Sequence, residues 1–99
     1  MEITRTDNNE SIVIAVQGKI NSITCKDLEA ELLKALEKSV NILLDLEKVD
    51  YVSSAGLRVL LLGEKKARAL KITMTVRNIC EDVYNVLEMT GFTNILTIQ

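Results

Sequence analysis

The stretch Leu44 to Leu57, LDLEKVDYVSSAGL, joins a buried strand to the beginning of a helix. The run from Asn41 to Leu46 is short and mostly apolar, which is typical of a central strand covered on both faces. Ser53 and Ser54 follow it, and apolar residues then recur at helical spacing to about Leu70. A strand that leads directly into a helix predicts a right-handed crossover and a parallel sheet.

Outward from this unit, strand-like and helix-like runs alternate along the whole chain. The pattern predicts strands over 2–6, 12–16, 71–76 and 95–98, a helix beginning at Thr24, and a helix over 81–90 that Gly91 ends. The order is therefore β-β-α-β-α-β-α-β. We expect an α/β fold with a largely parallel central sheet, an antiparallel edge hairpin and helices mainly on one face. Proline is absent and no stretch resembles a linker, so residues 1–99 are predicted to form a single domain.

The same periodicity predicts which side chains form the core. Thr24 is expected to cap the first helix, and Asp45, inside an apolar run, is expected to be hydrogen-bonded. Gly63 within a helix indicates a close contact with the sheet. The side chains expected to be buried are Leu28, Leu32, Ala35, Leu36, Leu57, Leu60, Leu61, Ala67, Val83, Val86 and Leu87, with Met74, Cys80 and Met89 filling gaps.

Composition excludes several classes of function. Twelve basic and fourteen acidic residues give a net charge of −2, which argues against nucleic-acid binding. Without histidine, catalysis by Ser-His-Asp or Cys-His is impossible. Cys25 and Cys80 are too far apart in the sequence to form a metal-type pair, and no cofactor or metal motif occurs. The apolar run 12–16 is too short to enter a membrane, and residues 1–5 lack a signal sequence. We expect a monomer in the cytoplasm.

The serine segment has two interpretations. Ser is a favoured N-cap, worth on the order of 1 kcal/mol over Ala, and this structural role alone explains its presence. Alternatively, the unpaired N–H groups of a first helical turn form a site for an anion, and the small residues Ala55 and Gly56 let a phosphate or a partner surface approach closely.

Three segments resemble those of one known family. The run Asp45 to Leu57, with its Ser-Ser-Ala-Gly-Leu ending, is similar to the characteristic segment of STAS domains, in particular the small bacterial anti-sigma factor antagonists. Gly18-Lys19-Ile20-Asn21 resembles the family's Gly-Glu-(Leu/Ile)-Asp segment, and residues 87–92 (LEMTGF) resemble the end of its last helix. The resemblance spans nearly the whole chain and implies the STAS fold.

The resemblance also implies a function. Such antagonists bind an anti-sigma factor that is a serine kinase, and this binding releases a sigma factor for transcription. They dissociate when the kinase phosphorylates a serine at the start of the second helix. A serine phosphatase then restores the binding form. The motif places the acceptor at Ser54, with Ser53 as its rival. Ser53, Lys19 and Asn21 stand where the family often has acids, so the partner contacts are expected to differ. The implied partner-binding residues are Lys19, Asn21, Ser22, Ser53, Ser54, Ala55, Gly56 and Arg58.

Two other classes of function compete with this interpretation. A STAS chain can be a constitutive subunit of a membrane-associated assembly, such as a lipid transporter, in which case the serines are only caps. An enzyme needs a general base near its nucleophile, and the guanidinium of Arg58, one turn beyond Ser54, stays protonated. We therefore expect a binding protein rather than an enzyme.

Overall fold

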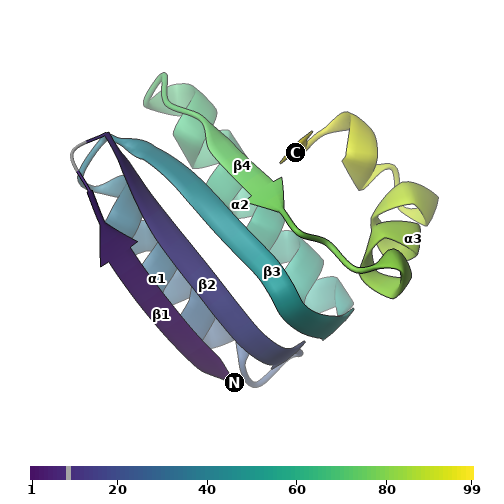
Figure 1. Ribbon diagram of the computed structural model, residues 1–99. Helices are drawn as coiled ribbons and strands as arrows, with labels where there is room; N and C mark the ends of the chain where they lie inside the picture. Colours follow the sequence, from purple (N-terminus) through teal and green to yellow (C-terminus); the bar gives the residue numbers. More distant parts are fainter. Residues whose placement is uncertain (9) are drawn as a thin grey trace.

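A five-stranded sheet forms the framework of the computed structural model, which describes residues 1–8 and 10–99 (Figure 1). β1 (Glu2–Asp7) and β2 (Ser11–Ile20) are antiparallel, and every other neighbouring pair is parallel. The predicted α/β class, element order and edge hairpin are confirmed. The strands lie in the order β1 (Glu2–Asp7), β2 (Ser11–Ile20), β3 (Asn41–Val52), β4 (Met74–Arg77) and β5 (Thr97–Ile98).

Two helices, α1 (Cys25–Leu36) and α2 (Ser54–Ala69), cover one face of the sheet and pack against each other (Figure 1). A third helix, α3 (Glu81–Met89), and a short 3-10 helix, η1 (Phe92–Asn94), lie on the β4 and β5 side of the molecule. Aliphatic side chains from α1, α2, α3 and the sheet form the core, as the low aromatic content requires. Across residues 1–8 and 10–99, no helix has the length and apolarity needed to cross a membrane.

Most of the predicted core is buried, but four side chains differ from expectation. Cys80, the N-cap residue of α3, is only half-buried. Leu61 on α2 and Val86 on α3 are only half-buried, because each lies at the border of the buried face of its helix. Met89 is 86% exposed rather than a core residue. It is the last residue of α3, two positions after the buried Leu87, and a two-residue step on a helix turns the side chain to the opposite face. Met89 is therefore a solvent-facing apolar residue.

The two central strands are longer than predicted. β3 continues from Leu46 to Val52 through polar residues, and Val49 and Val52 return to the core. Its pairing with β2 changes register between Ala15 and Gln17 and again between Gln17 and Lys19. Such bulges break the regular alternation that identifies a strand in a sequence. The extension carries both strands to the edge of the sheet where α1 and α2 begin.

The C-terminal strands are shorter than predicted. Lys71 has a φ of 60°, and the Ile72 amide donates to the carbonyl of Ala67 at 2.9 Å, so these residues end α2 rather than begin β4. Residues 92–94 form η1, which leaves only Thr97–Ile98 for β5. Gly91, at a φ of 80°, follows α3 as predicted, in the left-handed conformation that favours glycine.

An ion pair within α2, between the buried Glu64 and the exposed Arg68, is linked to the C-terminal segment. Glu64 is 4% exposed, and one of its carboxylate oxygens accepts a hydrogen bond from Arg68 Nε at 2.7 Å. Arg68 also donates from Nη2 to the carbonyl of Ile95 at 2.7 Å. The fixed guanidinium geometry allows one side chain to hold both acceptors. The chain entering β5 is thus attached to the second half of α2, away from the serines at its beginning.

Candidate functional site: the junctions that begin α1 and α2

The carboxyl ends of β2 and β3 lie side by side and bring two distant segments together (Figure 1). Lys19 pairs with Tyr51 and Ile20 with Val52 in the parallel register. The Ser53 amide donates to the Ile20 carbonyl at 2.8 Å, which extends the pairing into the junction itself. The turn before α1 and the start of α2 therefore form one surface at this edge of the sheet, and both groups of predicted site residues lie there.

Ser53 caps α2. Its backbone is extended, with φ −83° and ψ 174°, and its hydroxyl oxygen accepts a hydrogen bond from the Gly56 amide at 3.2 Å. This is the usual N-cap geometry, which satisfies one of the unpaired amides of the first turn. The side chain is half-buried. The hydroxyl of Ser53 is therefore engaged within the chain.

Ser54 occupies the first position of α2 and is exposed. The first turn of this helix carries no acidic residue, so nothing on it offsets the positive end of the helix dipole. A negative group placed on this hydroxyl is stabilised locally by that dipole. Of the two serines, Ser54 is the one presented to an approaching protein.

The other α2 residues of the predicted site have different surroundings. Gly56 is buried, and a Cβ there would lie 2.7 Å from Ile20 Cγ2 and 2.9 Å from Val52 Cγ1. Its small size therefore serves close packing of α2 on the two strands, and its contact with a partner stays a prediction. Ala55 is half-buried, and Arg58, one helical turn after Ser54, is exposed.

A compact turn presents the β2–α1 side of the surface. Asn21 Oδ1 accepts hydrogen bonds from the amides of Ile23 at 2.9 Å and Thr24 at 3.0 Å. The Thr24 hydroxyl accepts from the Asn21 amide at 2.9 Å and donates to the Lys19 carbonyl at 2.8 Å. Thr24 thus stands at the N-cap position, but contrary to the prediction its side chain does not cap the helix. Asn21 instead satisfies two amides of the turn that precedes α1. Ser22 is exposed in this turn.

We expect Asn21→Ala to lower the free energy of unfolding by about 1 kcal/mol, because two amides lose their acceptor as they do when an N-cap is removed. Chemical denaturation followed by circular dichroism measures this change. Asn85→Ala, an exposed asparagine on α3, is the matched control and should change the stability by less than about 0.5 kcal/mol. Equal losses in both variants would show that the Asn21 hydrogen bonds do not stabilise the turn.

Two apolar side chains of this surface did not stand out in the sequence. Ile23 is 79% exposed and Tyr51 is 47% exposed. Lys19 lies over the ring of Tyr51, with Nζ 5.7 Å from the centroid, and 3.5 Å from the carboxylate of Asp50. The sequence does carry a signal for them: each junction contains an apolar residue that does not fit the hydrophobic period of the neighbouring strand or helix. The surface therefore combines hydroxyls, charges of both signs and exposed apolar groups.

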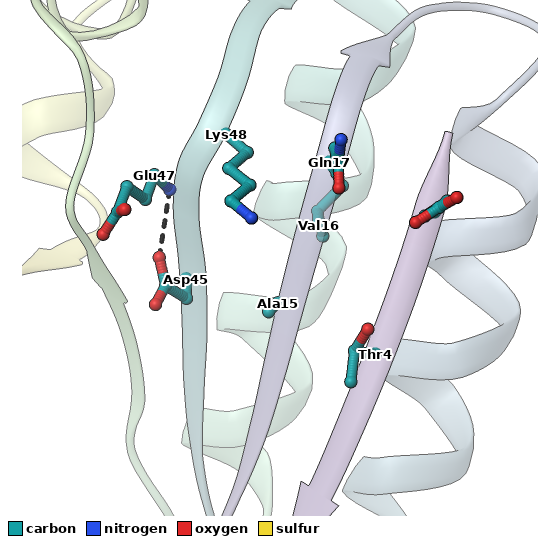
Figure 2. Close-up of a pocket in the computed structure, with 8 residues that line it drawn as sticks. Thr4, Ala15, Val16, Gln17, Asp45, Glu47 and Lys48 are labelled. Carbon is teal, nitrogen blue, oxygen red and sulfur yellow. Dashed lines mark hydrogen bonds between the residues drawn. The ribbon is translucent and has the colours of Figure 1, made fainter.

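A separate shallow hollow lies over β1, β2 and β3, where the register shifts (Figure 2). Its volume is about 160 Å³, and charged and neutral side chains line it, including Asp45, Glu47 and Lys48. Asp45 accepts a hydrogen bond from the Glu47 amide at 3.0 Å and from Asn78 Nδ2 at 3.3 Å, so the expected pairing of this carboxylate is confirmed. None of the predicted site residues lines this hollow. Within the described part of the chain, no three His, Cys, Asp or Glu residues are grouped to hold a metal ion.

Comparisons with known proteins agree with this arrangement. The STAS domain family model matches residues 1–99. BtrV of Bordetella bronchiseptica, which is named as an anti-sigma factor antagonist, is 34% identical over 99 residues, covering 99% of this chain and 85% of BtrV. The structure of unphosphorylated SpoIIAA, named as an anti-sigma factor antagonist, superposes with a TM-score of 0.83 at 17% identity, over 99% of this chain and 88% of that one. The phosphorylated form of SpoIIAA from Bacillus gives 0.76 at 15% identity, over 99% and 91%. The likeness to these structures is one of fold, whereas the family model and the 34% identity to BtrV show that this chain belongs to the STAS domain family.

Proposed function

We propose that this chain is an anti-sigma factor antagonist whose binding to its partner is switched off by phosphorylation of Ser54. In this proposal the partner is an anti-sigma factor with serine kinase activity. Binding frees a sigma factor for transcription, and a serine phosphatase restores the binding form. BtrV, at 34% identity, is named as an anti-sigma factor antagonist, which supports the general assignment. The chain acts as a monomer in the cytoplasm, without catalytic activity of its own.

The observation that carries the proposal is the exposed position of Ser54 at the first turn of α2. A kinase needs a hydroxyl that it can reach, and the neighbouring hydroxyl of Ser53 is held by the Gly56 amide. Exposure favours a phosphate at position 54 rather than at position 53, and the positive helix end stabilises the charge there. The β2–α1 turn lies on the same surface, so a partner that covers Ser54 also meets Lys19 and Ser22.

The proposed switch is electrostatic. Phosphorylation adds about −1.5 to −2 charge and three strong acceptor oxygens. In the free protein this charge is exposed at a helix N-terminus, where it is favourable by roughly 0.3–1 kcal/mol, so the fold is retained. In the complex the same charge would be buried against a surface shaped for a neutral hydroxyl, at a cost of several kcal/mol. The partner is therefore released without unfolding of the antagonist.

Mapping the phosphorylated residue tests the proposal. The kinase is obtained as the protein that the wild-type chain retains from its native cell; it is identified by mass spectrometry and purified. We expect incubation with this kinase and ATP to phosphorylate the wild type at one site and Ser54→Ala at none. Ser53→Ala, the matched control, should still be phosphorylated, although loss of its cap lowers stability by about 1 kcal/mol. Undiminished phosphate on Ser54→Ala would contradict the assignment.

A further inference from the structure

Ile23 is exposed in a way that the fold does not require. Its side chain is 79% exposed, although the chain buries most of its aliphatic residues in one core. A single exposed apolar residue is common on protein surfaces and indicates nothing alone. Ile23, however, lies on the same surface as Ser54, where Tyr51 is also exposed. Two exposed apolar side chains therefore lie on the surface that carries the proposed docking residue.

The turn that carries Ile23 is held rigidly. The Ile23 amide itself donates to Asn21 Oδ1 at 2.9 Å, and Thr24 fixes the turn to the carbonyl of Lys19. These hydrogen bonds fix the backbone of the residue before any partner arrives. Binding through a residue with a fixed backbone loses less conformational entropy than binding through a flexible loop. The geometry is that of a preorganised apolar contact.

The surroundings of Ile23 define the chemistry of a partner. Lys19 lies over the ring of Tyr51 and is paired with the Asp50 carboxylate at 3.5 Å, so Arg58, exposed one turn after Ser54, is the cation offered to a partner. The positive ends of α1 and α2 both lie at this edge of the sheet. A complementary surface therefore offers an apolar depression for Ile23 and Tyr51, with carboxylates at its border.

We infer that Ile23 is the apolar anchor by which this chain docks a partner protein, and that the partner receives it in an apolar depression bordered by acidic residues. The inference rests on the proposed function for the identity of the partner as the anti-sigma factor kinase. It adds a residue-level basis for affinity that is separate from the phosphorylation switch. Interface anchors of this kind carry most of the binding energy, whereas residues around them mainly exclude water.

Affinity measurements with the purified partner kinase test the anchor. We expect Ile23→Ala to weaken binding about 30-fold by isothermal calorimetry, which is the size of effect that defines an interface hot spot. Met89→Ala is the matched control, because Met89 is 86% exposed on the end of α3, and it should change the affinity less than twofold. Both variants should retain the wild-type melting temperature. Arg58→Glu should weaken binding and reduce its dependence on salt, as expected if the border of the depression is acidic.

The outcomes separate the anchor from the switch. If Ile23→Ala binds within threefold of the wild type while Ser54→Asp loses affinity, the anchor is wrong and the proposed function stands. If Ile23→Ala is weakened but Ser54→Asp is not, the anchor stands and the phosphorylation switch is wrong. Stronger binding by Arg58→Glu would overturn the acidic border.

Discussion

Gly56→Ala is expected to lower the free energy of unfolding by about 1–3 kcal/mol, the cost of overpacking a filled core. The new Cβ would lie 2.7 Å from Ile20 Cγ2, 2.9 Å from Val52 Cγ1 and 3.2 Å from the Ile20 carbonyl oxygen. The two methyl groups belong to β-branched side chains, which are stiff and close to the backbone. The first turn of α2 must therefore move away from the strands. For a domain of this size, each kcal/mol corresponds to a fall in melting temperature of about 4–8 °C.

Gly63→Ala is the matched comparison on the same helix. Its Cβ would approach Leu32 Cδ2 at 2.6 Å, the end of a flexible side chain, and Met74 Sδ at 2.8 Å, one atom before the end of another. Those side chains can rotate aside, and Ala gains about 1 kcal/mol of helix propensity over Gly. Gly63→Ala should therefore be clearly less destabilising than Gly56→Ala. The steric argument for position 56 is wrong if the two variants melt at the same temperature.

Gly56→Ala should also alter the site, because Ser54 lies two residues before it on the displaced turn. Amide NMR spectra are expected to show the largest changes at Ile20 and along residues 53–57, while the signals of α3 stay in place. This pattern would show that the packing of Gly56 against the strands also fixes the position of Ser54. A variant that loses stability with changes spread evenly over the molecule would indicate general loosening instead.

The sequence predicts the element order because each amphipathic run matches the period of its element. Leu28 and Leu32 on α1 and Leu60 on α2 are buried as the helical spacing requires. The predictions fail where burial or strand pairing in the folded protein does not follow the local sequence pattern. The polar residues after Leu46 hide the continuation of β3, since the bulge opposite them interrupts alternation. Met89 has core chemistry but lies on the outer face of a short helix.

The site is predictable in part for a similar reason. A cap-forming serine pair after a strand is a local pattern, so the position of Ser53 and Ser54 at the start of α2 follows from the sequence. The contact between the two junctions does not, because the bond from the Ser53 amide to Ile20 joins residues 33 positions apart. Nor does a sequence show which serine hydroxyl is engaged, since either residue is chemically able to cap. The contact follows from the parallel register of β2 and β3, and the hydrogen bond from the Gly56 amide identifies Ser53 as the engaged serine.

Ser54→Asp is expected to weaken binding to the partner kinase by about 100- to 1,000-fold, equivalent to roughly 2.7–4 kcal/mol. The carboxylate remains exposed and near the positive end of α2 in the free protein, so the melting temperature should stay within a few degrees of the wild type. In the complex the charge is covered and lacks a partner, and its desolvation produces the loss of affinity. Calorimetric titration together with a thermal melt measures both quantities on the same sample.

Ser54→Asn separates charge from size, because the amide has nearly the shape of the carboxylate but no charge. If charge is the switch, Ser54→Asn should bind within about tenfold of the wild type, and only Ser54→Asp should show the large loss. Equal losses would mean that the interface rejects bulk at position 54, which is a steric rather than an electrostatic mechanism. Full affinity in both variants would instead indicate constitutive binding, as in a permanent STAS subunit, in which the two serines serve the start of α2 alone.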